Sequence, residues 1–194
     1  MPNLDAPSGF VPVRHLNGGT VRYTGGYSID SGEASDIFLG DVVILDTATG
    51  DGNNIVPYAA GGGDIVGIFA GCQYTDANGD VRWEKQWRSG TATLGGVNAE
   101  AFVYVDPNIV YSVQFNGTLV AGNVNSFADA FVAAGNALNG VSAYELDSTV
   151  GASGQFQIIG LAGAPDGIFL ADISSANPRV EVIAAEHIHQ ATNT

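Results

Sequence analysis

The sequence is poor in cysteine and in charge. Cys72 is the single cysteine among 194 residues, so no disulfide can form within the chain. It lies in an apolar run, which predicts a small core residue. Charged residues make up only 13% of the chain, about half the share of an average soluble protein. A surface with so little charge is unusual for a free monomer and suggests that neighbouring molecules cover part of it.

Basic residues are scarcer still. Six Lys and Arg stand against 20 Asp and Glu, which gives a formal net charge of −14. Nucleic-acid binding draws on clustered basic residues, so we expect no direct nucleic-acid partner. We also expect no membrane segment, because no apolar run approaches the roughly 20 residues that a spanning helix needs. The opening MPNLDAPSG is polar and turn-rich, unlike a signal peptide.

Motifs of known chemistry are also missing from the sequence. There is no Gly-x-Ser-x-Gly nucleophile elbow, and the glycine-rich GGTVRYTGG and AAGGGD lack the lysine of a P-loop. His187 and His189 share one side of an extended segment, but a structural metal site needs about four ligands. We therefore interpret EHIH as a polar strand end. The sequence predicts no enzyme, no cofactor and no metal site.

The stretch TDANGD resembles the start of a calcium-binding loop. Asp76, Asn78 and Asp80 occupy its first, third and fifth places, but Val81 and Trp87 replace the glycine and glutamate that the sixth and twelfth places require. The Asn–Gly dipeptide is preferred in two-residue hairpin turns, where both residues take positive φ. We therefore predict a β-hairpin tip and not a metal site.

Short runs of β-branched and aromatic residues, bounded by Gly, Asn, Asp and Pro, recur along the chain. Together with 27 glycines, many at the boundaries of these runs, they predict an all-β fold, as a barrel or a sandwich. The predicted strands are Thr20–Thr24, Val42–Asp46, Asn54–Tyr58, Ile65–Tyr74, Val81–Trp87, Ala101–Val105, Ile109–Phe115, Phe156–Leu161, Gly167–Asp172 and Arg179–Ala184.

One segment has helical periodicity instead. Asn125 or Ser126 is placed to cap a short helix, in which Phe127 and Phe131 follow at helical spacing. Gly135 limits this helix to about three turns. The surrounding region is rich in Ala, Asn, Gly and Ser, which marks a change in composition after residue 116.

These signals divide the chain into three parts. Residues 1–19 form an extended N-terminal arm, residues 20–116 a small β-barrel, and residues 117–194 a C-terminal β lobe with the short helix. Pro12 argues against a core strand in the arm, yet its apolar residues argue against a disordered tag. Two alternatives stay open: the arm packs on its own domain, or it docks on a neighbouring subunit.

Both tryptophans lie in one predicted strand, beside several basic residues. Trp83 and Trp87, four residues apart, are expected on one face of that strand. Trp and Arg together are typical anchors of protein interfaces, so an interface is one interpretation. The other is that the tryptophans belong to the core.

Several segments resemble small virion structural proteins of tailed bacteriophages, notably marine phages. They are DAPSGFVPVRHLNGG (5–19), YSIDSGEASDIFLGDVV (27–43), IVGIFAGCQY (65–74), AFVYVDPNIVYSVQ (101–114) and RVEVIAAEHIH (179–189). The proteins that they resemble are similar to capsid decoration, or cement, proteins. Residues 32–74 also resemble the β-tulip barrel of several such proteins.

This resemblance implies a structural protein on the outer capsid surface of a virion, made in the cytoplasm of the bacterial host. The implied partners are the major capsid protein and two further copies of the chain in a homotrimer, with the arm reaching onto the shell or a neighbouring subunit. Deleting residues 1–19 is then expected to abolish capsid binding and leave the β domain folded. The candidate contact residues are Phe10, Val11, Val13, Arg14, His15, Arg22, Trp83, Trp87 and Arg88.

The alternative is a phage tail or fibre component, or a carbohydrate-binding β module. In that case exposed aromatic residues stack on sugars, with Trp83, Trp87, Tyr104 and Tyr111 as candidates. A hydrolase that uses scattered acidic residues is a third hypothesis, and it would require an activity that depends on a single carboxylate.

Overall fold

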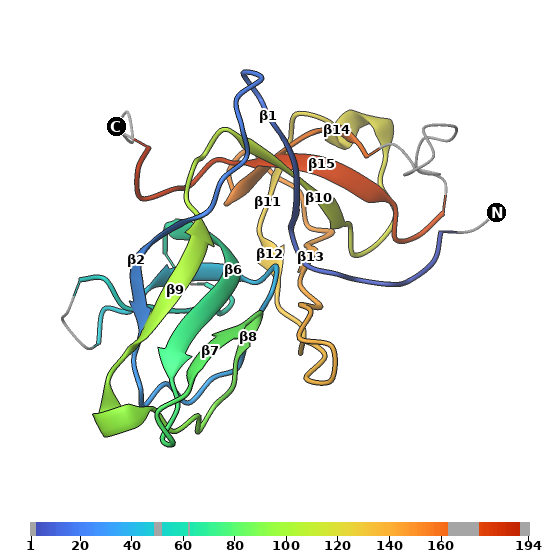
Figure 1. Ribbon diagram of the computed structural model, residues 1–194. Coiled ribbons are helices and arrows are strands. Elements are labelled where there is room, and N and C mark those ends of the chain that lie inside the picture. The colour runs from blue at the N-terminus through green and yellow to red at the C-terminus, as the bar shows by residue number, and fades with distance from the viewer. Residues whose placement is uncertain (1–2, 49–51, 62, 163–174, 191–194) are drawn as a thin grey trace.

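The computed structural model describes residues 3–48, 52–61, 63–162 and 175–190. These residues are organised as short strands in antiparallel ladders, and the prediction of an all-β fold is confirmed. In the described part of the chain, helical structure is limited to two 3-10 turns, η1 (Leu94–Gly96) and η2 (Ala121–Asn123). The strands gather into two main sheets, which lie side by side in Figure 1.

The first sheet has the strand order β2-β9-β6-β4-β5, and β7 pairs with the far end of β6. Its strands are β2 (Thr24–Ile29), β4 (Val42–Leu45), β5 (Ile55–Pro57), β6 (Ile65–Thr75), β7 (Val81–Glu84) and β9 (Ala99–Tyr104). A short ladder of β3 (Ile37–Phe38) and β8 (Gln86–Trp87) lies beside this sheet. The long β6 is its centre, because it pairs with β4, β7 and β9.

The second sheet has the strand order β1-β10-β15-β14-β11. Its strands are β1 (Val11–His15), β10 (Ile109–Gln114), β11 (Phe127–Ala128), β14 (Phe156–Leu161) and β15 (Arg179–Ala184). A further two-stranded ladder joins β12 (Ala130–Phe131) to β13 (Glu145–Leu146). Strands from both ends of the sequence therefore meet in one sheet.

The first sheet does not close into the predicted β-tulip-like barrel. Among the described residues, the link between its two end strands is an isolated bridge between Ser28 of β2 and Asn54, the residue before β5. A barrel requires a continuous ladder between the end strands. The expectation of a closed barrel is therefore wrong. One face of the open sheet encloses a buried cluster of its own, and the other face packs against the second sheet.

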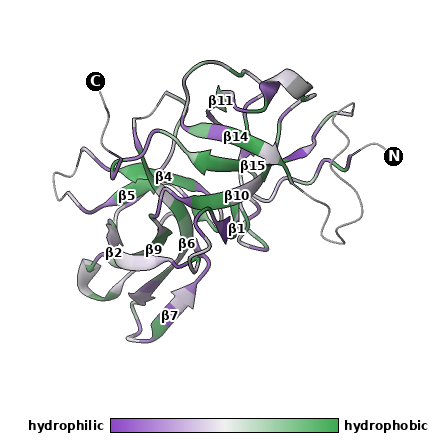
Figure 2. Cartoon of the chain, turned by 90° about the horizontal axis from the view of Figure 1, so that it is seen from above, coloured by the Kyte–Doolittle hydropathy of each residue, from purple (hydrophilic) through white to green (hydrophobic). Residues whose placement is uncertain are grey.

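The core explains why the open sheet is stable. One buried cluster combines Val42, Ile65 and Ile68 of the first sheet with residues of β10, β14 and β15 in the second. Figure 2 shows these strands as hydrophobic ribbon at the centre of the molecule. A second cluster lies within the first sheet and includes Trp87 and Cys72. Because the first cluster is shared, the two sheets bury apolar surface against each other.

The expected division at residues 19 and 116 does not follow the sheets. Residues 109–114 form β10, which pairs with β1 and β15 and so belongs to the second sheet. The expected arm is in part β1, an edge strand, which is a position in a sheet where proline is tolerated. Phe10 is 1% exposed and stacks on Phe156, with ring centroids 4.4 Å apart. The arm therefore packs on its own chain, and deleting residues 1–19 would open the core.

The predicted helix is wrong. Its residues form β11, which pairs with β14, and β12, which pairs with β13. Between them the carboxylate of Asp129 accepts a hydrogen bond from the Gln155 N–H at 3.0 Å. Ala128 and Ala130 are buried by this pairing, and Asn125 has a positive φ of 72°. Pairing with distant strands thus overrides local periodicity. The predicted strand Gly167–Asp172 lies outside the described residues.

The TDANGD stretch is the predicted hairpin tip, between β6 and β7. The Asp76 N–H donates a hydrogen bond to the Asp80 carbonyl oxygen. The loop that this bond closes therefore has three residues and not two. Gly79 alone takes positive φ, at 92°, as in a type I turn followed by a glycine bulge. Both carboxylate oxygens of Asp76 accept hydrogen bonds from within this hairpin.

Candidate functional site

An exposed row of aromatic side chains lies on the outer face of the first sheet. Trp83 of β7 stacks on Phe102 of β9, with ring centroids 5.3 Å apart and an interplanar angle of 2°. Tyr23 continues the row at 5.5 Å from Phe102 and 6.0 Å from Tyr104. Trp83 is 65% exposed and Tyr23 55%. We call Trp83, Phe102, Tyr23 and Tyr104 the aromatic row.

The strand register explains why these rings meet. Gln73 of β6 is paired with Trp83 on one side and with Glu100 on the other, so the three side chains share a face. Phe102 follows Glu100 by two residues and therefore lies on the same face. Its partner in β6 is Gly71.

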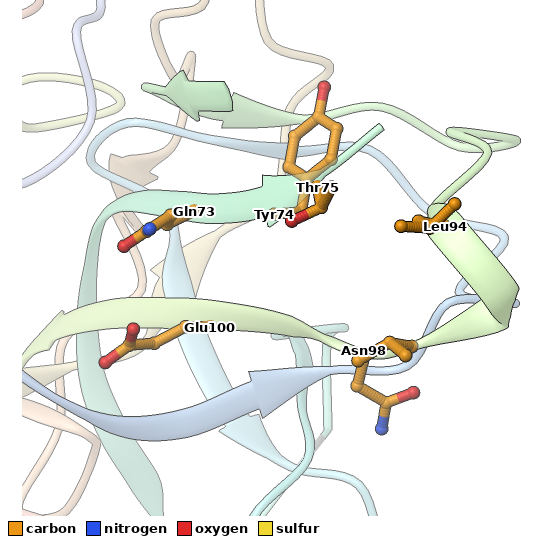
Figure 3. A pocket seen from close by; sticks show the side chains of 7 residues that line it. Gln73, Tyr74, Thr75, Leu94, Asn98 and Glu100 are labelled. Atoms are coloured by element: carbon orange, nitrogen blue, oxygen red, sulfur yellow. The ribbon is translucent and has the colours of Figure 1, made fainter. Parts of the chain in front are cut away.

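A shallow pocket of about 280 Å³ adjoins the row. Figure 3 shows the side chains that line this pocket. It lies between the ends of β6 and β9 and the η1 turn. Its lining combines polar side chains with two exposed apolar ones, and comprises Gln73, Tyr74, Thr75, Leu94, Val97, Asn98 and Glu100. Gln73 and Glu100 therefore belong both to the pocket and to the face that carries the aromatic row. The site joins flat rings to hydrogen-bonding groups.

The charge around this site is negative. Glu100 is an exposed carboxylate, and the cation on β7, Arg82, is already paired with Asp76 at 2.9 Å and Asp80 at 3.4 Å. Backbone hydrogen bonding from Asp80, together with the contact to Arg82, lowers the pKa of Asp76. The carboxylate of Asp76 therefore stays ionised and holds the arginine within the hairpin.

A second exposed surface follows the edge strand β1 and the turn after it. Val11, Val13 and Leu16 keep 40%, 47% and 46% of their surface exposed. Arg14 lies among them and pairs with Glu181 of β15 at 2.6 Å. We call the side chains of Val11, Val13, Arg14 and Leu16 the β1 surface. His15 is turned away from solvent, and its Nε2 lies 2.9 Å from a carboxylate oxygen of Asp106.

The nine candidate contact residues do not form one surface. Val11, Val13 and Arg14 lie together on β1, whereas Trp83 lies on the other sheet (Figure 1). Arg22 is exposed in the connection to β2. Arg88 is also exposed and donates to the carbonyl of Ala137 at 2.6 Å.

Phe10 and Trp87 are buried, and neither offers surface to a partner. Trp87 is 0% exposed, packs edge-on against Tyr74 and pairs with Ile37 in the β3–β8 ladder. The prediction that Trp83 and Trp87 share a face is wrong, because a bend at Lys85 separates β7 from β8. One tryptophan therefore belongs to the core and the other to the surface.

His187 and His189, which the sequence assigns to a polar strand end, lie beyond the last residue of β15. His187 is buried, and its Nδ1 accepts the His189 N–H at 3.1 Å. Burial, reinforced by His189, lowers the pKa of His187 to about 4. The ring of His189 lies 5.4 Å from that of His187 and contacts the Tyr27 hydroxyl at 3.1 Å. His187 is thus a neutral core histidine.

The described residues provide no grouping of three or more His, Cys, Asp and Glu side chains that suits a metal ion. Cys72 is a buried core residue as predicted, and burial raises the pKa of its thiol to about 12. Burial also raises the pKa of the Asp41 carboxyl to about 6. Within the described ranges, no helix has the length and apolar character needed to cross a membrane.

The sequence reasoning missed Phe102 and Tyr23 as members of the site. The alternation Glu100, Phe102, Tyr104 in a strand places these three side chains on one face, and that signal was present. Tyr111, a proposed sugar-stacking residue, is instead buried in the shared core. Tyr104 is half-buried at the end of the row.

Comparisons with protein-family models, with curated proteins and with solved structures found no match for this chain.

Proposed function

We propose that the protein is a non-catalytic virion component that binds the outer surface of a phage capsid and stabilises it as a decoration protein. Its proposed partners are the major capsid protein and two further copies of itself. The β1 surface is the observation that carries this proposal. The resemblance described above supports it, as does the low share of charged residues, 13% of the chain.

The β1 surface suits side-chain docking more than strand addition. β1 is an edge strand of the second sheet, and its register shifts between Pro12 and Arg14. Proline and a bulge both hinder the pairing of a further strand. The exposed Val11 and Val13 remain available for apolar contacts, and each square ångström that they bury contributes about 25 cal/mol. A subunit that binds only the assembled shell stabilises it by mass action.

The test is co-sedimentation of the purified protein with empty capsids of the virus that encodes it. A V11D/V13D double variant is expected to reduce capsid occupancy at least tenfold, because two carboxylates would have to be desolvated on docking. Since both valines are exposed, the variant should keep the thermal stability of the parent chain. Light scattering on the unbound protein measures the expected trimer.

The matched control is V120D/L138D, which adds the same charge at exposed apolar positions outside the β1 surface. It is expected to bind capsids like the parent. Equal capsid occupancy of V11D/V13D and the parent chain would contradict the role of the β1 surface. A parent chain that ignores capsids altogether would overturn the proposed function.

A further inference from the structure

We propose that the aromatic row and the adjoining pocket form a binding site for neutral oligosaccharides. This inference does not depend on capsid binding, because the site lies on the first sheet and the β1 surface on the second. It would give the protein a second activity, namely the attachment of the particle that carries it to a glycan-covered surface. Three properties of the site point to this ligand class.

The first property is a flat, exposed platform. The outward face of Trp83 is fixed in orientation, because the ring stacks in parallel on Phe102. Tyr23 extends the apolar surface beyond Phe102. A pyranose ring has a flat side of C–H groups, and such a side packs on an aromatic face and buries apolar area. A row of rings along a sheet suits consecutive sugars of an extended chain.

The second property is the set of polar groups beside the platform. Gln73 and Glu100 lie next to Trp83 in the strand register, and neither side chain makes a hydrogen bond within the described part of the chain. An amide and a carboxylate offer donors and acceptors for the hydroxyl groups at a sugar rim. An apolar protein partner would instead bury these two groups without hydrogen bonds, which is unfavourable.

The third property is charge. Glu100 repels anionic ligands, and Arg82 is already neutralised by two aspartates of the hairpin. The net charge of −14 acts in the same direction. Uronic-acid polymers, sulfated glycans and nucleic acids are therefore disfavoured. A neutral saccharide satisfies both the rings and the polar groups without a charge penalty.

Tryptophan fluorescence gives a direct test, because Trp83 is 65% exposed and Trp87 is 0% exposed. The full chain is titrated with neutral hexose and N-acetylhexosamine oligomers, with a uronic-acid oligomer as the charged comparison. At least one neutral series is expected to shift the emission to shorter wavelength and to protect Trp83 from acrylamide quenching. Calorimetry on the same pair measures the affinity.

Three variants define the site in that calorimetric assay. W83A is expected to weaken binding at least tenfold, whereas W83F, which keeps an aromatic ring, is expected to retain most of the affinity. L138A, at an exposed apolar position outside the site, is expected to bind like the parent chain. Because Trp83 and Leu138 are both exposed, the three variants should remain folded.

Several outcomes would overturn the inference. They are the absence of binding by every neutral oligomer at millimolar concentration, equal affinity of W83A and the parent, or preference for the uronic-acid oligomer. Light scattering tests whether a second copy of the chain, and not a saccharide, binds to the aromatic row. If W83A converts an oligomer into a monomer, the row is a contact between copies of the chain. Loss of capsid binding with saccharide binding intact would refute only the proposed function.

Discussion

Phe10 shows how a single side chain changes the interpretation of the N-terminal segment. It is 1% exposed, stacks on Phe156 and belongs to the core cluster that both sheets share. Around it the chain is tied down by polar contacts. The side chain of Arg179 donates to the Ser8 hydroxyl at 2.6 Å, and the Ala6 N–H donates to Gln114 at 3.0 Å.

Truncation of Phe10 is therefore expected to lower the stability of the whole molecule. F10A should reduce the free energy of unfolding by about 3–5 kcal/mol, the usual cost of replacing a buried Phe by Ala. Urea unfolding monitored by circular dichroism measures this change. V13A is the matched control on the same segment, and its exposed side chain predicts a change within about 0.5 kcal/mol. Similar values for the two variants would show that the segment is not anchored by Phe10.

Cys72 and the two tryptophans show which single-residue predictions hold and which fail. The sequence correctly predicts that Cys72 is a core residue, because it lies in the apolar run that forms β6. The same alternation rule assigned Trp83 and Trp87 to one face. It failed because the rule holds only within an unbroken strand, and the bend at Lys85 interrupts this one.

At the scale of elements, the sequence predicts long strands that are rich in β-branched residues, but it does not predict the two-residue strands. The bounds of β14 and β15 agree with the predicted Phe156–Leu161 and Arg179–Ala184. These runs are rich in β-branched residues and end at turn residues. By contrast, β11, β12 and β13 have two residues each, and their partners lie far away in sequence. No local signal encodes such pairs.

The aromatic row illustrates the same limit. The sequence shows which residues are aromatic, but it does not show that Trp83 and Phe102 are in contact. That contact depends on β7 and β9 flanking the same strand, β6. That arrangement is a property of sheet order.

The neighbouring strand β9 requires a glycine near the start of β6. Gly67 has a φ of 155°, and a Cβ added there would collide with the carbonyl oxygen of Tyr104 in β9. G67A should lower the free energy of unfolding by about 1–3 kcal/mol from backbone strain alone, with the collision adding to that loss. Thermal unfolding followed by circular dichroism measures the effect.

The control for this prediction is G63A. Gly63 precedes β6, is exposed, and would place a Cβ in open space. It is expected to change stability by no more than about 0.5 kcal/mol. If G67A is as stable as G63A, then β6 and β9 do not approach each other as closely at Gly67 as the structure shows.

For the whole molecule, two buried titratable groups oppose each other between about pH 4 and pH 6. His187 has a folded-state pKa of about 4 against 6.5 for a free side chain, so the unfolded chain binds more protons in this range. Stability due to His187 therefore rises with pH. Asp41 has a folded-state pKa of about 6 against 3.8, so the folded chain binds more protons, and stability due to Asp41 falls as pH rises.

The surroundings of both groups explain these directions. His187 lies among Asp64, Asp106 and His189, and burial outweighs the two carboxylates that favour its charged form. Asp41 is 1% exposed, and one of its oxygens accepts the Phe38 N–H at 2.8 Å. Its other oxygen is buried without a hydrogen bond, which favours the protonated carboxyl.

Removal of either group should uncover the other. In D41N the free energy of unfolding is expected to rise more steeply between pH 4 and pH 6 than in the parent, because the opposing contribution of Asp41 is gone. In H187N, whose side-chain oxygen can still accept the His189 N–H, it is expected to rise less steeply or to fall. Urea unfolding at half-unit pH steps measures both slopes. Parallel pH profiles for the parent and the two variants would show that neither buried group titrates in this range.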